Sequence, residues 1–284
     1  MIPVVKNIDE VRKYVKTAKR EGKSVALVPT MGFLHEGHKS LIVRAAKEND
    51  FIVVSDFVNP TQFGPNEDYE SYPRDIEKDR ALCEEAGADI VFNPEPSEMY
   101  HNPLTTVSVD KITSVLCGAS RPTHFAGVAT VVSKLFNIVS PDRAYFGEKD
   151  AQQLIVIKKM VKDLNFDIEI VGCPIVREAD GLAKSSRNTY LNDDERRASL
   201  CLSRSLNIGK ELIEKGETSA QTVKSAIIRE IEKEPLACID YVEISSLDTL
   251  EPTERTDGSI LTAIAVYIGK TRLIDNFIIE KADH

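Results

Sequence analysis

Two histidines three residues apart, His35 and His38, stand between a short apolar run and a helical pattern. The apolar run over 25–28 predicts a buried parallel strand, and the spacing of apolar residues over 39–50 predicts a helix. Backbone N–H groups at a helix start are unpaired and carry partial positive charge, so they attract phosphate. Two imidazoles and Gly37 at such a turn favour a site for nucleotide phosphates.

The histidine pair also has two plainer interpretations. A histidine in a loop is often a structural residue, and a pair can form half of a zinc site. Zinc requires further Cys or His ligands at short spacing, and the nearby sequence supplies none. The strand, the glycine and the helix together therefore favour nucleotide chemistry over zinc.

A second turn of the same kind follows residues 142–146, which predict another strand. It reads Gly147, Glu148, Lys149, Asp150 and leads into a predicted helix. Here Lys149 would point at bound phosphate, and Asp150 would help to hold Mg²⁺ directly or through water. On the alternative interpretation Asp150 caps the helix and Lys149 is solvated.

A polar cluster, Lys184, Ser185, Ser186 and Arg187, follows a predicted hinge over 176–183. Two cations and two hydroxyls within four residues suit a mobile loop that closes on a triphosphate. The alternative is a solvated basic loop on the surface.

Uncharged polar residues follow the second predicted strand. Asn59 and Gln62 can both donate and accept, which suits the hydroxyl and carboxylate oxygens of a small acid. Gln153 lies one helical turn beyond the Lys149 turn, and Arg121 and His124 stand in a loop before a long helix. An Asn-Pro turn with a solvated Gln, and a surface Arg and His, remain the alternatives.

The composition limits the classes of function. The chain has 284 residues, with 42% hydrophobic and 29% charged residues and a formal net charge of −9. The acidic balance argues against a broad nucleic-acid surface, so we expect small-molecule partners and no nucleic acid. We also expect no membrane association, because no apolar run approaches the roughly 18 residues of a span. Five scattered cysteines and no signal-peptide pattern predict reduced thiols and a cytoplasmic location.

The order of predicted elements indicates an α/β fold with two domains. Helix, strand, helix and strand within the first 55 residues imply a parallel sheet, which binds ligands beyond the carboxyl ends of its strands. We place a first domain over 1–176 and a smaller α+β lid domain over 177–284. Further predicted strands cover 89–92, 105–109, 142–146 and 166–171, and later antiparallel ones 240–246, 259–268 and 271–279; predicted helices cover 74–86, 195–214 and 219–233.

Five blocks of sequence together resemble the pantoate–β-alanine ligase (pantothenate synthetase) family. The His-x-Gly-His block alone is shared with many nucleotidyltransferases, and the Lys-Ser-Ser-Arg loop resembles the Lys-Met-Ser-Lys-Ser loop of other adenylate-forming enzymes. All five in this order are highly specific. The blocks are Pro-Thr-Met-Gly-x-Leu-His-x-Gly-His (29–38), Phe-Val-Asn-Pro-Thr-Gln-Phe (57–63), Arg-Pro-x-His-Phe-x-Gly-Val (121–128), Phe-Gly-Glu-Lys-Asp-x-Gln-Gln (146–153) and Asp-Gly-Leu-Ala-x-Ser-Ser-Arg-Asn (180–188).

The resemblance implies a Rossmann-like nucleotidyltransferase domain and an ATP-dependent, AMP-forming ligase that requires Mg²⁺. Such an enzyme condenses (R)-pantoate with β-alanine through pantoyl adenylate, releasing pyrophosphate and AMP, in the pathway to pantothenate and coenzyme A. It also implies a homodimer formed by the first domain.

The resemblance also implies roles for individual residues. The implied catalytic residues are His38, the proton donor, with His35, Lys149, Ser185, Ser186 and Arg187. The implied ATP-binding residues are Met31, Gly32, Phe33, Leu34, His35, Glu36, Gly37, His38, Gly147, Glu148, Lys149, Asp150, Val176, Lys184, Ser185, Ser186 and Arg187. The implied pantoate- and β-alanine-binding residues are Gln62 and Gln153, to which we add Asn59 and His124, and Asp150 is the expected metal ligand.

Three positions depart from the family pattern. Cys117 stands where many members have Glu, and Thr123 stands where many have Gly. Lys184 stands where Met or Leu is common, and the added cation predicts tighter ATP binding.

Two rival functions remain open from the sequence. One is a nucleotidyltransferase with another acceptor, such as a cytidylyltransferase or a trimmed aminoacyl-tRNA synthetase. The other is a non-catalytic nucleotide sensor, which would bind ATP without releasing pyrophosphate.

Overall fold

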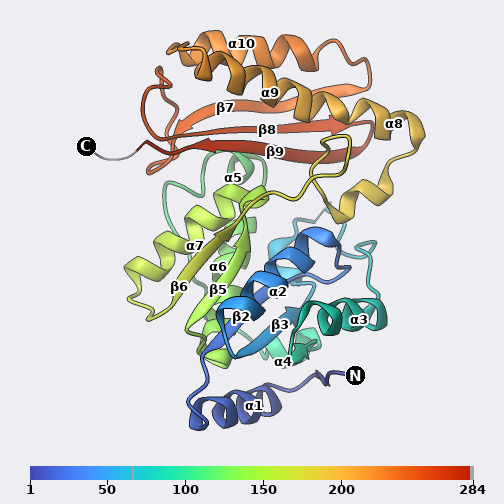
Figure 1. Cartoon of the computed structure of the whole chain (residues 1–284), viewed down its shortest axis with the longest axis vertical. Helices are drawn as coiled ribbons and strands as arrows, with labels where there is room; N and C mark the ends of the chain where they lie inside the picture. The colour runs from blue at the N-terminus through green and yellow to red at the C-terminus, as the bar shows by residue number, and fades with distance from the viewer. Residues whose placement is uncertain (66, 282–284) are drawn as a thin grey trace. The chain divides into compact units, whose positions relative to one another are not determined.

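Six strands of the described chain form one parallel sheet (Figure 1). The structure is a computed structural model and describes residues 1–65 and 67–281. The strand order is β1-β4-β3-β2-β5-β6, and each strand pairs in parallel with its neighbour, which confirms the predicted fold class. The strands span Val4–Val5 (β1), Val25–Thr30 (β2), Phe51–Asp56 (β3), Ile90–Phe92 (β4), Arg143–Gly147 (β5) and Glu169–Cys173 (β6).

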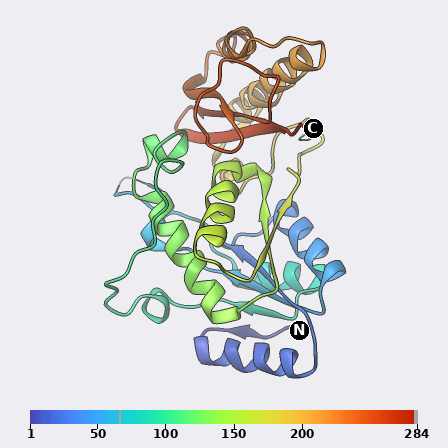
Figure 2. The same ribbon diagram turned by 90° about the vertical axis from the view of Figure 1, so that its left-hand side faces the viewer.

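Helices cover both faces of this sheet. Apolar residues of α1 (Ile8–Arg20), α6 (His124–Val139) and α7 (Ala151–Asp163) share one core with one face. Those of α2 (Glu36–Glu48) and α3 (Ile76–Ala86) share a second core with the other face. Figure 2 shows α6 and α7 side by side. The sheet is therefore buried on both faces.

The burial of β2 explains its continuous apolar run. Val25 and Leu27 pack into the core beside α1 and α6, whereas Ala26 and Val28 pack into the core beside α2 and α3. All four side chains are fully buried. A parallel strand with helices on both faces favours an unbroken apolar sequence over an alternating one.

The direction of winding reverses between β2 and β5. From β2 the sheet continues through β3 to β4 on one side, and from β5 to β6 on the other. In open parallel sheets, ligands bind outside the carboxyl ends of the strands at such a switch point. Both turns that the sequence singled out begin here, because Thr30 ends β2 and Gly147 ends β5.

The chain divides into two compact units. The first comprises 1–110, 121–148 and 153–174, and the second comprises 111–120, 149–152 and 175–284. Within the described part of the second unit, three strands form an antiparallel sheet, as predicted. Whether residues 177–284 act as a lid remains a prediction.

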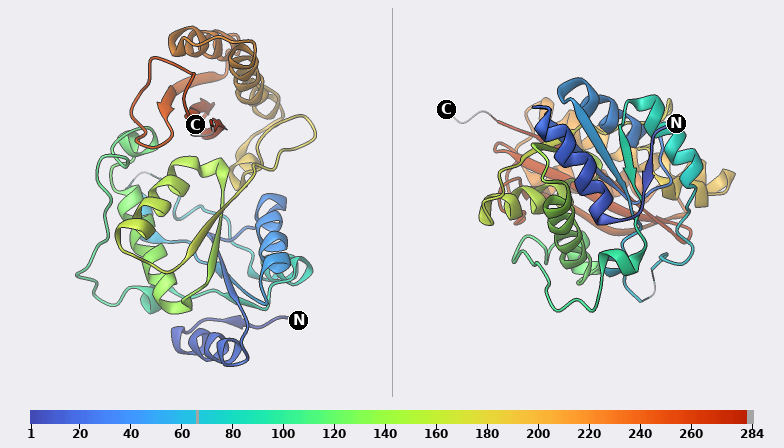
Figure 3. Two further views of the ribbon diagram at one scale, coloured as in Figure 1. Left: turned by 60° about the vertical axis from the view of Figure 1, so that its left-hand side comes forward. Right: turned by 90° about the horizontal axis from the view of Figure 1, so that it is seen from below.

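Two helices of the second unit cover one face of its sheet (Figures 1 and 3). Their apolar residues form one core with the inward side chains of the strands. These elements span Leu200–Glu214 (α9), Ala220–Ile231 (α10), Ala237–Ser246 (β7), Ile260–Ile268 (β8) and Thr271–Ile279 (β9). The short helices of the whole chain span Pro60–Gln62 (η1), Pro96–Met99 (α4), Cys117–Ser120 (α5), Glu148–Asp150 (η2), Ser186–Tyr190 (η3) and Asp193–Ala198 (α8).

Some predicted elements were wrong in extent or kind. Residues 105–109 form no strand; the Val107 N–H donates to Thr130 Oγ1 instead, and Val107 packs against the core. The predicted helix 195–214 is two helices, because α8 ends before Ser199. The strand predicted from residue 166 begins only at Glu169. None of the helices in the described ranges combines the length and the hydrophobicity that a membrane span requires.

The approach of α6 to η1 requires a glycine. A Cβ at Gly127 would lie 2.6 Å from the backbone nitrogen of Gln62 and would also overlap the carbonyl of Thr61. The Gly127 carbonyl accepts a hydrogen bond from Asn59 Nδ2 at 3.2 Å. A backbone contact this close leaves no room for a methyl group, so any larger residue must displace η1.

We predict that Gly127→Ala lowers the stability of the chain by about 1–3 kcal/mol, the usual cost of overpacking. The measurement is urea unfolding followed by circular dichroism. Gly258→Ala is the matched control, because nothing lies within 4 Å of a Cβ there. Equal stability of the two variants would show that η1 moves without cost.

Candidate active site

The ring nitrogens of His35 and His38 have defined roles in the turn after β2. His35 caps α2, and its Nδ1 accepts from the Gly37 N–H at 3.1 Å. His38 Nδ1 accepts from the His35 N–H at 3.3 Å, and the ring centroids are 4.1 Å apart. A nitrogen that accepts a hydrogen bond carries no proton, so each neutral ring bears its hydrogen on Nε2. The turn thus presents two neighbouring Nε2–H donors of the kind that bind phosphate oxygens.

The backbone amides of this turn are largely occupied. Asp79, on α3, accepts from the Phe33 N–H through Oδ2 and from the Leu34 N–H through Oδ1, each at 2.6 Å. The Gly32 N–H donates to Thr30 Oγ1 at 3.2 Å. The sequence analysis predicted that amides at the start of the helix attract phosphate. The amides of residues 32–34 lie before that start and have partners within the chain. The start of α2 favours an anion, and the imidazoles are groups of the type that donate to one.

A second buried carboxylate, Asp56, ends β3 beside this turn. Asp56 and Asp79 are 5% and 3% exposed, and burial raises the pKa of both. For Asp56, burial and the neighbouring charge of Asp79 raise the pKa to about 7. Sequence reasoning missed both residues. Asp79 is one of several acidic residues on a charged helix, but an aspartate that ends an apolar strand, as Asp56 does, was a usable signal.

Gln62 is held by a network of buried amides. Its Oε1 accepts from Asn59 Nδ2 at 3.1 Å, and its Nε2 donates to Met31 Sδ at 2.7 Å. Asn59 Oδ1 in turn accepts from the Tyr100 hydroxyl at 2.7 Å. The structure therefore brings Gln62 against the histidine turn. Asn59, expected to contact substrate, has internal partners at both ends of its amide, and its Nδ2 holds the Gln62 side chain.

His124 and Arg121 hold the backbone of the same residue. The Gln62 carbonyl accepts from His124 Nδ1 at 2.9 Å and from Arg121 Nη2 at 3.4 Å. Arg121 also forms a two-point ion pair with Glu67. Burial alone would raise the pKa of Glu67, but these contacts hold that pKa below its ordinary value. His124, expected to contact substrate, thus braces Gln62.

Lys149 and Asp150 belong to the second unit, where their side chains form a loose ion pair of 3.8 Å. The Lys149 carbonyl accepts from Asn276 Nδ2 of β9 at 2.8 Å. Asp150 is half exposed. Gln153, at the start of α7, is partly buried. Its neighbour Gln152 is a structural residue that donates to the carbonyls of 112 and 115 and accepts from the amide of 117.

The Lys-Ser-Ser-Arg loop lies in a braced part of the second unit. The Lys184 N–H donates to the Val176 carbonyl at 2.9 Å, which closes a tight turn over 177–183. Ser185 Oγ accepts from the Arg187 N–H at 3.3 Å at the start of η3. Arg196 binds Glu178 at 2.8 Å on the same segment. Hydrogen bonds within the second unit thus hold the backbone on both sides of the loop.

Cys117, one of the unusual positions noted in the sequence, lies beside a cation. Its Sγ lies 3.2 Å from the Tyr241 hydroxyl and 3.7 Å from Arg272. Arg272 pairs instead with Asp240 at 2.7 Å. Asp240 therefore supplies the negative charge that Cys117 cannot. For Thr123, the structure shows only that it precedes α6 as the N-cap, without a side-chain cap bond.

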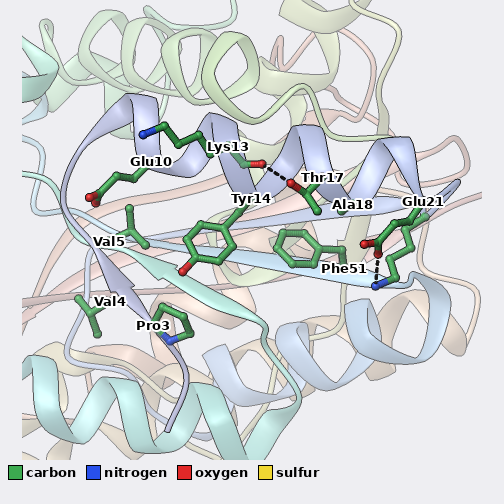
Figure 4. A pocket seen from close by; sticks show the side chains of 11 residues that line it. Pro3, Val4, Val5, Glu10, Lys13, Tyr14, Thr17, Ala18, Glu21 and Phe51 are labelled. Carbon is green, nitrogen blue, oxygen red and sulfur yellow. Dashed lines mark hydrogen bonds and ion pairs between the residues drawn. The ribbon is translucent and has the colours of Figure 1, made fainter.

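Two other features were candidates for a functional site, namely a metal-binding cluster and the hollow in Figure 4. Among the described residues, no group of three or more His, Cys, Asp or Glu side chains is placed to hold a metal ion, so the zinc alternative gains no support. The hollow, of about 660 Å³, lies between α1 and the strands, where Tyr14 and Phe51 line it (Figure 4). The hollow extends under α1 from Phe51, at the start of β3, to Val4 and Val5 of β1, and no residue of the histidine turn lines it.

Comparison with known proteins identifies the family of the chain. The family model described as pantoate-beta-alanine ligase matches residues 3–278. The chain is 63% identical to pantothenate synthetase of Clostridium acetobutylicum, covering 96% of this chain and 98% of that one. It is 60% identical to pantothenate synthetase of Clostridioides difficile, covering 98% and 99%.

Solved structures show the same likeness. The crystal structure of pantothenate synthetase from Thermus thermophilus matches with a TM-score of 0.93 and 44% identity, over 99% of this chain and 100% of that one. Pantoate-beta-alanine ligase from Francisella tularensis, complexed with beta-gamma ATP and beta-alanine, matches with a TM-score of 0.79 and 34% identity, over 98% of each chain. The chain belongs to the pantoate–β-alanine ligase family.

Proposed function

We propose that the chain condenses (R)-pantoate with β-alanine at the expense of ATP. In the first step a carboxylate oxygen of pantoate bonds to the α-phosphorus, and the bond to the bridging oxygen breaks, so that pyrophosphate leaves with the electron pair. In the second step the amine nitrogen of β-alanine bonds to the acyl carbon, AMP leaves, and the amine loses a proton. The intermediate is a mixed anhydride of the substrate, so no nucleophilic side chain is required.

The contact between Gln62 and Met31 carries this proposal. It sets an amide that suits a small hydroxy acid against a turn that suits a nucleotide. Pantoate offers two hydroxyls and a carboxylate, and Gln62 and Gln153 are the proposed amides that recognise them. Binding both substrates in one place replaces a bimolecular encounter with an oriented one.

The proposed role of the histidines follows from their tautomer. Charge builds up on the α-phosphate and on the leaving pyrophosphate in the transition state. Neutral rings with hydrogen on Nε2 can donate to those oxygens, and we assign proton donation to His38. The turn from Met31 to Gly37, with Gly32, Phe33, Leu34 and Glu36, forms the remainder of the proposed nucleotide site.

Further cations are needed, because triphosphate carries several negative charges and the described turn carries none that is positive. We assign this role to Lys149, Lys184 and Arg187, with Ser185 and Ser186 as hydroxyl donors. Gly147, Glu148 and Val176 complete the proposed ATP-binding set.

Asp150 fits a magnesium ion bound mainly through ATP. Mg²⁺ usually takes one or two protein carboxylates together with substrate phosphates and water. The half-exposed carboxylate of Asp150 can serve as that single protein ligand. When bound, Mg²⁺ would neutralise phosphate charge. We further propose a cytoplasmic homodimer in which residues 177–284 act as a lid, as the family resemblance suggests.

The first test is release of pyrophosphate from ATP and Mg²⁺, with pantoate alone and then with β-alanine. We predict a single burst with pantoate and continuous turnover once β-alanine is added. His38→Ala should slow adenylation by about 10²–10³-fold, the usual loss for one oxyanion donor. His101→Ala, at an exposed histidine, is the control and should match the wild type.

Binding of ATP without any pyrophosphate release would instead support a nucleotide sensor. Release that ignores pantoate but responds to another acid or alcohol would support a nucleotidyltransferase with a different acceptor.

We predict that Lys184→Met raises the KM for ATP by about tenfold, because a partly buried cation at the phosphates contributes roughly 1–1.5 kcal/mol. The kcat should change little. Lys210→Met, at an exposed position of α9, is the matched control. An unchanged KM for ATP in Lys184→Met would contradict a phosphate contact by this side chain.

A further inference from the structure

Asp79 shapes the nucleotide turn from behind. Its two oxygens accept from the consecutive amides of Phe33 and Leu34, each at 2.6 Å. Short bonds of this kind to a carboxylate are about twice as strong as bonds between neutral groups. Gly32 and Phe33 both have positive φ, of 77° and 51°, and Phe33 reaches that conformation only because something holds it. Asp79 is the group that does so.

Asp56 reaches the same point from the sheet. A Cβ at Gly32 would overlap Asp56 Oδ1 and would lie 3.3 Å from Asp79 Oδ2. The two carboxyl groups therefore converge beneath Gly32. Two carboxylates held this close in a buried site are stable together only if one of them holds a proton. Because Asp79 already accepts two amide N–H groups, the proton belongs on Asp56.

Among the described contacts of Asp56 and Asp79, no cation offsets their negative charge. The charge of Asp75, the N-cap of α3, acts on Asp79. On α3 itself, burial and the charges of Asp56 and Asp79 raise the pKa of the Cys83 thiol to about 12. From the loop after β4, Asn93 Nδ2 donates to the Asp56 carbonyl at 2.7 Å and is uncharged. The turn itself carries the imidazoles of His35 and His38.

We propose that Asp56 and Asp79 are a proton-sharing positioning pair for the nucleotide turn, so that the turn binds ATP well only while the pair carries a single negative charge. This inference rests on the proposed role of residues 31–38 in ATP binding. Loss of the shared proton places two like charges in a buried site, which drives the carboxylates apart and loosens the hold of Asp79 on Phe33 and Leu34. It also adds negative charge behind an anion site.

The sign of the pH effect follows from where the proton is held. The pKa of Asp56 is about 7 in the fold, against an ordinary value near 4. Below pH 7 the pair keeps its proton and the turn is held; above pH 7 the proton leaves and ATP binding weakens. The cost to folding stability begins earlier, as pH rises above 4, because the unfolded chain loses this proton first.

The test is the Kd of ATP with Mg²⁺ by calorimetry between pH 5.5 and 8.5, without pantoate, so that ATP is not consumed. Asp56→Asn keeps a donor to Asp79 but cannot ionise. The titration of ATP is common to both proteins and cancels in the comparison. Asp50→Asn is the matched control, since Asp50 precedes the same strand at its opposite end.

We predict equal Kd values for wild type and Asp56→Asn at pH 6, and about tenfold weaker binding by the wild type at pH 8.5, a typical coupling between two linked equilibria. Asp50→Asn should follow the wild type throughout. Parallel pH profiles for wild type and Asp56→Asn would overturn the pairing. Failure of the wild type to bind ATP at any pH would instead overturn the proposed function.

If Asp56→Asn fails to fold, a measurement on the wild type alone tests the proposal. Carboxyl-carbon NMR of aspartate-labelled protein should show one buried carboxyl group titrating near pH 7. By reciprocity, ATP should raise that midpoint by about one pH unit if the coupling is tenfold. A midpoint that ATP does not move, or no carboxyl group titrating above pH 6, would refute the proposal.

Discussion

The hydrogen bonds from the Phe33 and Leu34 amides to Asp79 are the constraint on which the site depends. They hold Gly32 and Phe33 at positive φ. This conformation costs of order 1 kcal/mol or more at a residue other than glycine, as at Phe33. This bend sets where the chain enters α2, and so where His35 becomes its N-cap. The ring orientations then follow from local backbone bonds. The chemistry of the turn thus depends on a carboxylate that never needs to touch a ligand.

The same arrangement recurs around Gln62. Asn59, His124 and Arg121 each have internal partners, and each acts on Gln62 by holding its side chain or its carbonyl. Gly127 allows α6 to approach closely enough for these contacts. A side chain that recognises a small acid must be fixed before the acid arrives, because ordering it during binding costs affinity. The buried polar residues around the site serve mainly to fix a few that face the ligand.

The sequence predicted the groups with local signals and missed those without one. The strand, turn and helix around His35 and His38 were correct because apolar periodicity and a glycine are read along the chain. Asp79 was missed because its partners, Phe33 and Leu34, are more than 40 residues away, and nothing on α3 distinguishes it from its acidic neighbours. The strand predicted over 105–109 failed for the related reason that alternation reports one-sided burial, not the presence of a partner strand.

The position of Asp79 creates an electrostatic conflict that the rest of the chain must resolve. A buried negative charge behind the turn disfavours the triphosphate that the turn is proposed to bind, and the chain as a whole carries a net charge of −9. Neutral imidazoles cannot offset it. Under the proposed function, attraction comes from the cations assigned to the phosphates and from the ion that accompanies ATP. A second charge on Asp56 would add to the repulsion at short range, where solvent screens least. Keeping the proton on Asp56 is the arrangement that satisfies the backbone of the turn at the smallest cost to anion binding.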